Sequence, residues 1–387
     1  MPAAARRLGL ALLLAAGGCC SYGPGDGGYP TASHTEPVQV ANLGGPTLGA
    51  IQLVTVTYAD DPLRATDEAF GSWVVTSAWW AAVGKDYGLD AGTAVNVELT
   101  QDAPSAVTDV GIDGQLTSWV QDGTLPKPTP QTLYLVYFPA STAVTTSDQT
   151  VISCTYAAGY HAESQSSQSP FAYAVVPTCP SAASGTLASE VQGVASHEIL
   201  EAATDPLPGS NPAYQLPQTS PWNLGTGSAG GELADLCFPL STVDDGYTVS
   251  RGWSNSSAAA GGDPCVPTDP GAPYFSVSPV PETITLPPGG TAKVTLLGWA
   301  TGPLPAPWTI GAGIPGVPAN SLQSFVTITP GTLENDGIAQ LQLSAAGLPL
   351  SGTFTLVVYS QATDLLGGNP PDILNHESYW PITVTVP

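Results

Sequence analysis

A histidine and two glutamates within five residues are the part of this sequence whose types and spacing could do chemistry. The run His197-Glu198-Ile199-Leu200-Glu201 places His197 and Glu201 four positions apart. On a helix their side chains therefore lie one above the other and could bind one metal ion. Glu198 would lean toward a metal-bound water and activate it as a general base. Zinc hydrolases of the HExxH type carry histidine at both metal-binding positions, and here Glu201 replaces the second one.

A third ligand must come from another segment, because a catalytic divalent ion takes about three protein ligands and a water. Glu232 and Asp235 are the leading candidates, since they lie three positions apart after the motif and just before Cys237, which could pin them. Asp205, eight residues after His197, is another candidate. We expect the metal to be zinc. Manganese and calcium are alternatives, because a carboxylate-rich ligand set is less specific for zinc than two histidines are.

His161 is a further histidine to weigh, because it follows Cys154 and precedes an apolar run at Phe171–Val176. On pattern alone we favour a surface histidine in a polar loop. The alternative is a fourth metal ligand or a catalytic residue, and the sequence pattern leaves both open.

The motif needs a helix, and the flanking sequence predicts one. Thr186 can cap its first turn, and Pro206 ends it after Thr204-Asp205. Apolar residues recur on one face at Leu187, Val191, Val194, Ala195, Ile199 and Ala202. His197 should therefore lie well inside this helix.

Buried strands interleaved with helices predict the class of the region around the motif. Ile51–Tyr58 alternates as a strand, and Leu133–Phe138 and Phe171–Val176 are apolar runs typical of strands buried on both faces. Amphipathic stretches begin at Thr66 and at Asp109. We therefore predict a zincin-like α/β N-terminal domain.

The composition changes from about Tyr274 to short strands punctuated by Pro and Gly. The predicted strands are Phe275–Ser278, Thr283–Leu286, Ala292–Leu297, Phe325–Ile328, Ile338–Leu343, Phe354–Tyr359 and Trp380–Val386. Such strands without helical periodicity predict an all-β immunoglobulin-like sandwich. The predicted organisation is a signal peptide at 1–19, a flexible linker at 20–43, the α/β domain at 44–270 and the sandwich at 271–387.

The first residues are typical of an export signal. Arg6 and Arg7 precede the apolar run Leu8–Ala16, which is too short to span a bilayer. Gly17-Gly18-Cys19 resembles a bacterial lipobox, although Ala16 stands where leucine is commoner. We expect a lipid anchor at Cys19 as the only membrane attachment, with simple secretion as the alternative. Either route predicts an extracellular or outer-surface location.

The charge balance excludes one class of partner. Of the seven Lys and Arg residues two lie in the leader, and 31 Asp and Glu residues give a net charge of -24. Affinity for phosphate comes largely from Lys and Arg, so we expect no nucleic-acid binding.

The cysteines agree with export. The four beyond the leader are Cys154, Cys179, Cys237 and Cys265, an even number without a CxxC pair. Three pairings are open. The shortest loops favour Cys154 with Cys179 and Cys237 with Cys265.

With these residues in view, the order of motifs resembles the EXORDIUM (phosphate-induced protein) family over residues 44 to about 265. The resemblance is carried by Gly44-Gly45-Pro46, Trp79-Trp80, Cys154 with Gly159-Tyr160-His161, Phe171-Ala172-Tyr173, the run Ala195–Pro206 and the run Gly231–Cys237. Plant members are secreted apoplastic and cell-wall proteins without a firmly assigned activity. The resemblance implies one site made of His161, His197, Glu198, Glu201, Glu232 and Asp235.

Two functions follow as hypotheses. The first is an exported metal-dependent hydrolase, most simply a peptidase acting on a peptide or cell-envelope substrate, in which Glu198 activates the water. The second is a non-catalytic cell-surface or cell-envelope binding protein with a structural or vestigial metal site, which the replacement at Glu201 favours.

Overall fold

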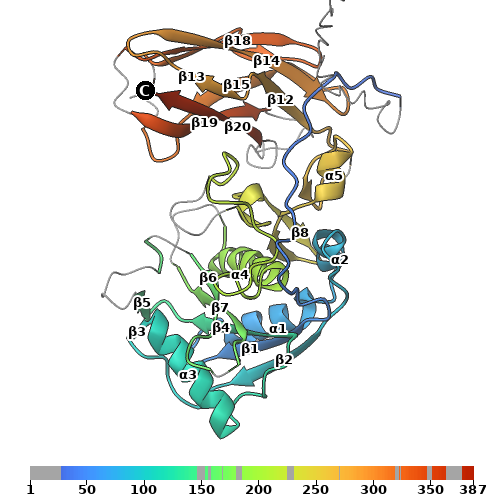
Figure 1. The fold of residues 1–387 in the computed structure, drawn as a ribbon. Coiled ribbons are helices and arrows are strands. Elements are labelled where there is room, and N and C mark those ends of the chain that lie inside the picture. The colour runs from blue at the N-terminus through green and yellow to red at the C-terminus, as the bar shows by residue number, and fades with distance from the viewer. Residues whose placement is uncertain are drawn as a thin grey trace, which may run out of the picture.

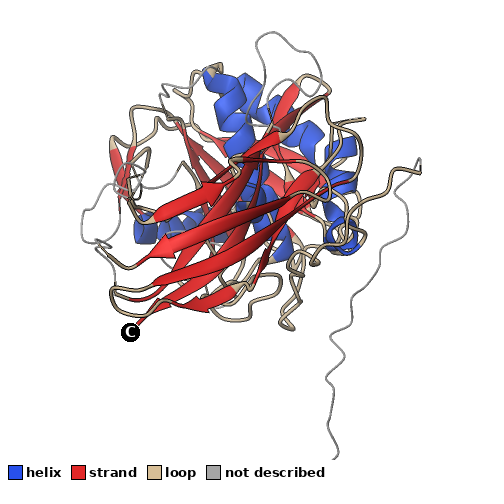
Figure 2. Cartoon of the chain, turned by 90° about the horizontal axis from the view of Figure 1, so that it is seen from above, coloured by secondary structure: helices blue, strands red, loops and turns tan. Residues whose placement is uncertain are grey.

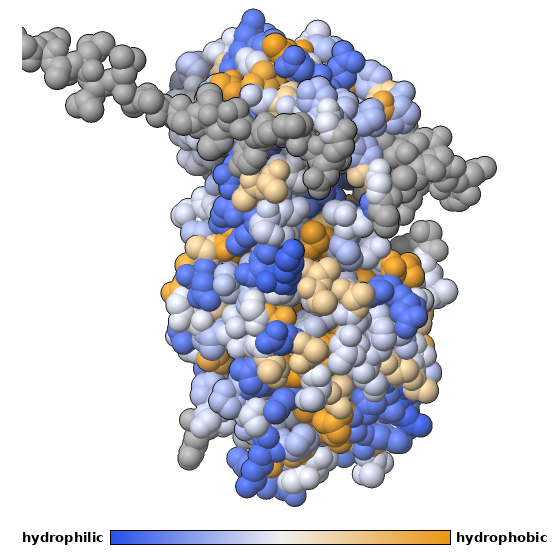
Figure 3. Space-filling model, turned by 90° about the vertical axis from the view of Figure 1, so that its right-hand side faces the viewer, coloured by the Kyte–Doolittle hydropathy of each residue, from blue (hydrophilic) through white to orange (hydrophobic). Residues whose placement is uncertain are grey.

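The computed structural model describes most of the chain after the leader. The described residues are 28–145, 153–155, 158–167, 169–179, 185–224, 231–269, 271–318, 322, 324–346, 351–362 and 377–387. The predicted signal peptide and the lipobox cysteine Cys19 lie outside them. None of the helices in these ranges is both long and apolar enough to cross a lipid bilayer. On the face shown in Figure 3, apolar residues are scattered among polar ones.

A five-stranded sheet forms the centre of the N-terminal part, residues 28–269 (Figure 1). Its order is β2 (Thr93–Glu98), β1 (Gln52–Thr57), β4 (Thr132–Phe138), β7 (Ala172–Pro177) and β6 (Tyr160–Glu163). The first four strands are parallel, and β6 pairs antiparallel with β7 at the edge. All seven residues of β4 are buried, as expected for a central strand covered on both faces.

Helices cover the two faces of this sheet. On one face α1 (Arg64–Val74), α2 (Ala78–Gly84) and α4 (Leu187–Thr204) share a hydrophobic core with the sheet. On the other face α3 (Asp109–Asp122) packs in a second core. Successive residues of β4 alternate between the cores, so that Leu135 faces α4 while Tyr134 and Val136 face α3.

The segment after α4 folds into several short elements. They are the 3-10 helix η1 (Asp235–Cys237), β8 (Ser241–Asp244), β9 (Tyr247–Ser250), β10 (Gly252–Trp253), α5 (Asn255–Ala259) and β11 (Cys265–Val266). Strands β8 and β9 form one hairpin, and β10 pairs with β11. A further short pair joins β3 (Ala106–Thr108) and β5 (Ala143–Thr145). Strand β9 holds this segment against α4, because the Ser250 N–H donates to Ser196 and the Thr248 N–H donates to Gln192.

The C-terminal part, residues 271–387, consists of two sheets (Figures 1 and 2). One contains β12 (Phe275–Val280), β14 (Thr291–Ala300), β18 (Ile338–Ser344) and β16 (Val326–Thr329). The other contains β13 (Thr283–Thr285), β20 (Glu377–Val386), β19 (Gly352–Gln361), β15 (Trp308–Gly313) and β17 (Thr332–Leu333). Their inward residues form one core, for example Leu296 and Leu341 with Val358 and Ile382.

An extended strap, residues 28–48, crosses both parts before β1. Near its start it is bound to the C-terminal part, where Asn335 bridges the Ala32 N–H and the Pro30 carbonyl, and His34 stacks on Trp299 with ring centroids 3.7 Å apart. Further along, Asn255 of α5 bonds both backbone groups of Val40 at 2.9 and 2.8 Å. Composition predicted a flexible linker for residues 20–43, whereas the described portion makes these specific contacts.

The predicted fold class, a zincin-like α/β domain followed by an immunoglobulin-like sandwich, is wrong. Strands make up 34% of the structure and helices 18%, and the strands are divided among several sheets. The described residues show no clear zincin-like domain. Segments with a clear hydrophobic period could be predicted from the sequence. Very short strands such as β8 to β11 have too few residues to show such a period. In the C-terminal part, the parallel pairing of β13 with β20 and the strand β15 had no sequence signal.

Candidate metal centre

Helix α4 carries the HExxE motif and is fixed at its start and on its buried side. Thr186 accepts a hydrogen bond from the Ser189 N–H at 3.1 Å, which confirms the predicted cap. Ser196, fully buried, accepts the Ser250 N–H at 2.8 Å and so joins α4 to β9. His197 is held next to this anchored position.

His161 lies on β6 opposite Ala174 of β7, whose side chain is in the core that α4 shares with the sheet. Because paired residues of neighbouring strands share a face, His161 points toward α4. Its Nδ1 lies 3.8 Å from Glu198 Oε2 and 3.7 Å from Glu201 Oε2, and its Nε2 lies 3.4 Å from Glu232 Oε1. The interpretation of His161 as a surface residue is wrong, since only 5% of its side chain is exposed.

His197 makes a second set of contacts on the other side of Glu201. Its Nε2 lies 3.1 Å from Glu201 Oε1 and 3.5 Å from Asp235 Oδ1. The Asp235 backbone N–H donates to the same Glu201 oxygen at 3.1 Å. Phe238 lies edge-on to the His197 ring, with centroids 6.4 Å apart. Thus η1 presents Asp235 to the motif helix, as a downstream ligand must.

Two trios of ligand atoms result. The first is His161, Glu201 and Glu232, the second is His197, Glu201 and Asp235, and within each trio one ligand atom per residue lies within 4.8 Å of the others. The residues fit a metal ion by a further observation. His161 Nε2 and Glu232 Oε1 are buried without a hydrogen-bond partner, which is costly unless another group binds them.

Asp205 does not join this cluster. Its Oδ1 accepts the Ala213 N–H at 2.8 Å and its Oδ2 accepts from Gln215 Nε2 at 3.0 Å. Burial raises the pKa of Asp205 to about 6, although these hydrogen bonds act in the opposite direction. Asp205 therefore pins the chain that follows α4, and it belongs to neither trio.

Glu198 lies beside the His161 trio and is 5% exposed. Gly159 leaves room for it, because a Cβ at this position would come within 2.9 Å of Glu198 Oε1 and 2.6 Å of a Val194 methyl. The carboxylate predicted as a general base is thus held within the cluster.

The carboxylates of the cluster favour positive charge on the two histidines or on a bound cation. Burial alone would lower the pKa of both histidines, but the surrounding carboxylates outweigh it and raise the pKa of His161 and His197 well above the ordinary value. Burial, together with Asp235, raises the pKa of Glu201 to about 8. A cation placed among these carboxylates would relieve their repulsion.

A cavity of about 260 Å³ opens next to Asp235, between the two parts of the chain. Its lining includes Trp222, Phe238 and Leu240 from the N-terminal part. Strands β19 and β20 add Tyr359 and Glu377. No sequence signal pointed to these last two residues, because they lie more than a hundred positions from the motif in strands of ordinary pattern.

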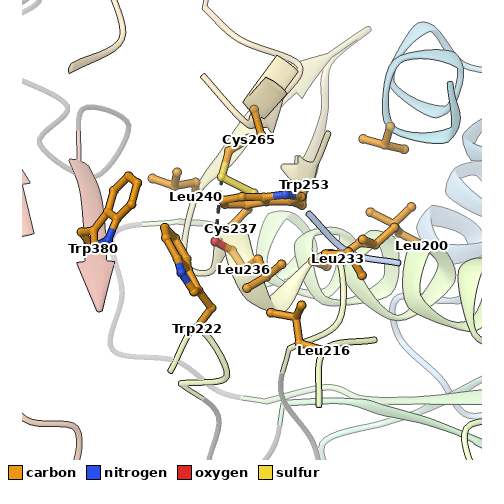
Figure 4. Close-up of a cluster of buried hydrophobic side chains, with 14 of the residues drawn as sticks. Leu200, Leu216, Trp222, Leu233, Leu236, Cys237, Leu240, Trp253, Cys265 and Trp380 are labelled. Carbon is orange, nitrogen blue, oxygen red and sulfur yellow. Dashed lines mark hydrogen bonds between the residues drawn. A yellow bond between two sulfur atoms is a disulfide. The ribbon is translucent and has the colours of Figure 1, made fainter. Parts of the chain in front are cut away.

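The disulfides have the predicted pairing, Cys154 with Cys179 and Cys237 with Cys265. Cys237 ends η1, so its bond to β11 fixes the element that carries Asp235. Figure 4 shows this bond among buried side chains that include Trp222 and, from β20, Trp380. Two disulfides are compatible with an extracellular or cell-surface protein.

Comparison with protein-family models finds no matching family, and no curated protein matches the chain. Among solved structures, domains 4 and 5 of the S-layer protein SbsC are similar to part of it. The match covers 30% of this chain and 53% of that one, with 9% sequence identity and a TM-score of 0.19. The chain thus spans about half of that structure, and so low a TM-score carries no argument about fold or function.

Proposed function

We propose that the protein is an exported metal-dependent hydrolase whose centre is the cluster around Glu201. The observation that carries the proposal is the convergence of two histidines and three carboxylates from β6, α4, η1 and the residue three positions before η1. Buried ionisable groups cost free energy unless they are paired or bind a metal. A cluster of such groups with orphaned atoms is better explained by a ligand than by stability.

The side chains divide into ligands and a base. His161, His197, Glu201, Glu232 and Asp235 would hold the metal, and their mixture of nitrogen and carboxylate oxygen suits zinc first and manganese next. Calcium, which prefers oxygen alone, is the weaker alternative. When bound, such an ion lowers the pKa of water and polarises a carbonyl or phosphoryl oxygen. Glu198, which belongs to neither trio, would accept the proton of the attacking water.

A peptide is the simplest substrate for this arrangement. The cavity beside Asp235 has the size of one large side chain and offers the aromatic and aliphatic surfaces of Trp222, Phe238 and Leu240. Its acidic residues Asp235 and Glu377 would favour a neutral or cationic substrate. A cell-envelope peptide would meet these requirements for a protein that acts outside the cell.

The test combines metal content with hydrolysis. The full chain should contain zinc or manganese and cleave members of a broad peptide library. Glu198→Gln should reduce the rate by at least about 100-fold while the metal stays bound, because a general base typically contributes that much. Glu190→Gln, in the first turn of the same helix, is the matched control and should leave both unchanged. Wild-type protein without metal would remove the proposal.

The second candidate is a non-catalytic cell-surface protein in which the metal is structural. The burial of the centre favours it, since the side chains of His161 and Glu201 are each 5% exposed. In that case metal removal would destabilise the fold, and no peptide would be cleaved. Cleavage abolished by Glu198→Gln would decide against this candidate.

Attachment and ancestry complete the proposal. A lipid at Cys19 would tether the protein to the outer surface, and Cys19→Ala should release it into the medium if the lipobox is used. The EXORDIUM resemblance over residues 44 to about 265 stays part of the proposal. It implies one site, and His161, His197 and Glu232, from three of its motifs, all lie in the candidate centre.

A further inference from the structure

The two trios share only Glu201, and its two oxygens face different partners. Glu201 Oε1 lies toward His197 at 3.1 Å, and Glu201 Oε2 lies toward His161 at 3.7 Å. We propose that the centre binds two divalent cations, with the Glu201 carboxylate as the bridge between them. This inference rests on the proposed function only in requiring that the chain binds metal.

The geometry supports two positions over one. A single ion would require the ligand atoms of all five residues to converge on one point, but they fall into two sets of three. In the second set, the separations of 3.1 and 3.5 Å are close to those between neighbouring ligands around one ion at ~2.1 Å. A carboxylate that binds one ion with each oxygen suits the ~3.5–4 Å spacing of two-metal sites.

Charge balance points the same way. Glu198, Glu201 and Glu232 are each at least nine-tenths buried, and Asp235 adds a fourth, partly exposed carboxylate. One divalent cation would balance only two of these four negative charges, and any further positive charge in the site would have to come from a protonated histidine. Two divalent cations would neutralise all four, which is the arrangement that a poorly solvated site favours.

The unpartnered atoms lie in the trio that an ordinary HExxE site would not use. His161 Nε2 and Glu232 Oε1, 3.4 Å apart, are buried without a hydrogen-bond partner, and neither residue belongs to the motif. If one ion sat between His197 and Asp235 alone, these two atoms would have only each other, as an ion pair without hydrogen-bond geometry. A second ion at His161, Glu201 and Glu232 accounts for both.

Each trio supplies three ligands, which leaves open positions on both ions for water and substrate. In two-metal hydrolases the ions hold the attacking and the departing oxygen or nitrogen of one displacement. Glu198, 3.8 Å from His161 Nδ1, is then placed at the first ion, whereas the cavity begins at Asp235 beside the second. An ion held by His161, Glu201 and Glu232 would therefore supply the water, and one held by His197, Glu201 and Asp235 would bind the substrate.

Metal counting on the full chain tests this inference. After dialysis against zinc or manganese, elemental analysis should find two ions per chain in the wild type. His161→Ala and Asp235→Asn should each retain one, and Glu201→Gln should weaken both. Glu163→Gln is the matched control, since Glu163 lies on the same strand as His161 but is bonded to Ser210 and Gln165. It should retain two.

Spectroscopy of the wild type keeps the test independent of variants that fold poorly. The manganese-loaded protein should show the electron paramagnetic resonance spectrum of a spin-coupled pair. One ion per wild-type chain with an uncoupled spectrum would overturn the two-ion centre and leave the proposed function intact. No bound ion would overturn both.

Discussion

The N-terminal and C-terminal parts bury polar groups of different kinds. Among the described residues of the N-terminal part, buried charged residues are Asp61, Asp67, Asp113, Glu163, Glu198, Glu201, Asp205, Glu232 and Arg251. Among those of the C-terminal part, the buried polar residues are the serines Ser276, Ser278, Ser360 and Ser378. A neutral hydroxyl costs less to bury than a carboxylate, even where, as at Ser276 and Ser360, it has no hydrogen-bond partner.

The buried carboxylates of the N-terminal part fall into two groups, those with local hydrogen bonds and those gathered around Glu201. In the N-terminal part some buried carboxylates are bonded locally, as Asp113 is by Ser164 and two backbone N–H groups. Others gather around Glu201 without enough protein partners. The described C-terminal residues include no buried charged side chain. They contact η1, which carries Asp235, through Tyr379, whose hydroxyl donates to the Leu236 carbonyl.

Metal removal should have the largest effect, and it should destabilise the N-terminal part but not the C-terminal part. A chelator should abolish hydrolysis and cost the N-terminal part about 4 kcal/mol if free metal otherwise exceeds its Kd about 1000-fold. Hydrogen exchange followed by mass spectrometry should show lost protection in β6 and α4 and unchanged protection in β14 and β18. An equal loss of protection from hydrogen exchange in both parts would contradict the expectation that only the N-terminal part depends on the metal.

A cavity in the C-terminal core should destabilise that part and leave metal binding unchanged. Leu341→Ala removes a fully buried side chain of β18 and should lower the free energy of unfolding by about 3 kcal/mol. Metal content should not change. Denaturant unfolding and elemental analysis on the same sample check both, and metal loss in this variant would show that the parts are coupled.

Asp67 provides a pH test of buried charge outside the candidate metal centre. It is 1% exposed, both of its oxygens lack hydrogen-bond partners, and burial raises its pKa from 3.8 to about 8. The folded state thus keeps a proton that the unfolded chain releases, so the stability that this group contributes is full below about pH 4 and is lost as the pH rises to 8.

Asp67→Asn should therefore become more stable relative to the wild type by about 2.7 kcal/mol between pH 5 and pH 7. Thermal unfolding at several pH values measures the difference. Asp60→Asn, at an exposed position in the turn after β1, is the control. A stability difference that does not change with pH would mean that Asp67 is ionised in the folded protein.

The smallest expected effect concerns the contact between the parts. Tyr379→Phe removes the hydroxyl that donates to the Leu236 carbonyl and should cost about 1 kcal/mol. Metal content and hydrolysis should persist, because Asp235 is also held by the disulfide at Cys237. A calorimetric melt with a metal assay checks this, and loss of metal would assign the tyrosine a positioning role.

Local signals allowed the motif helix to be predicted from sequence. The Thr186 cap, the apolar face and Pro206 mark α4, and the spacing of His197 and Glu201 follows from the helical repeat. Glu232 and Asp235 were predicted because a cysteine follows them, and the Cys237–Cys265 bond confirms that reason. These inferences needed only nearby residues.

The remaining features depend on tertiary contacts. His161 lies on a four-residue edge strand, too short to show a period, so its burial could not be predicted. Asp205 had suitable chemistry and spacing, but backbone and side-chain donors use its oxygens. The division of the ligands into two trios depends on which way each Glu201 oxygen faces, and no sequence pattern specifies that.

The strap has a mechanical consequence. A pull on the chain ahead of residue 28 would first load the bonds from Asn335 and the His34–Trp299 stack, and next the bonds from Asn255. Only after these had yielded would tension reach β1 and the sheet that supports His161. A protein tethered through its N-terminus and exposed to shear would in this way keep the force away from the candidate metal centre.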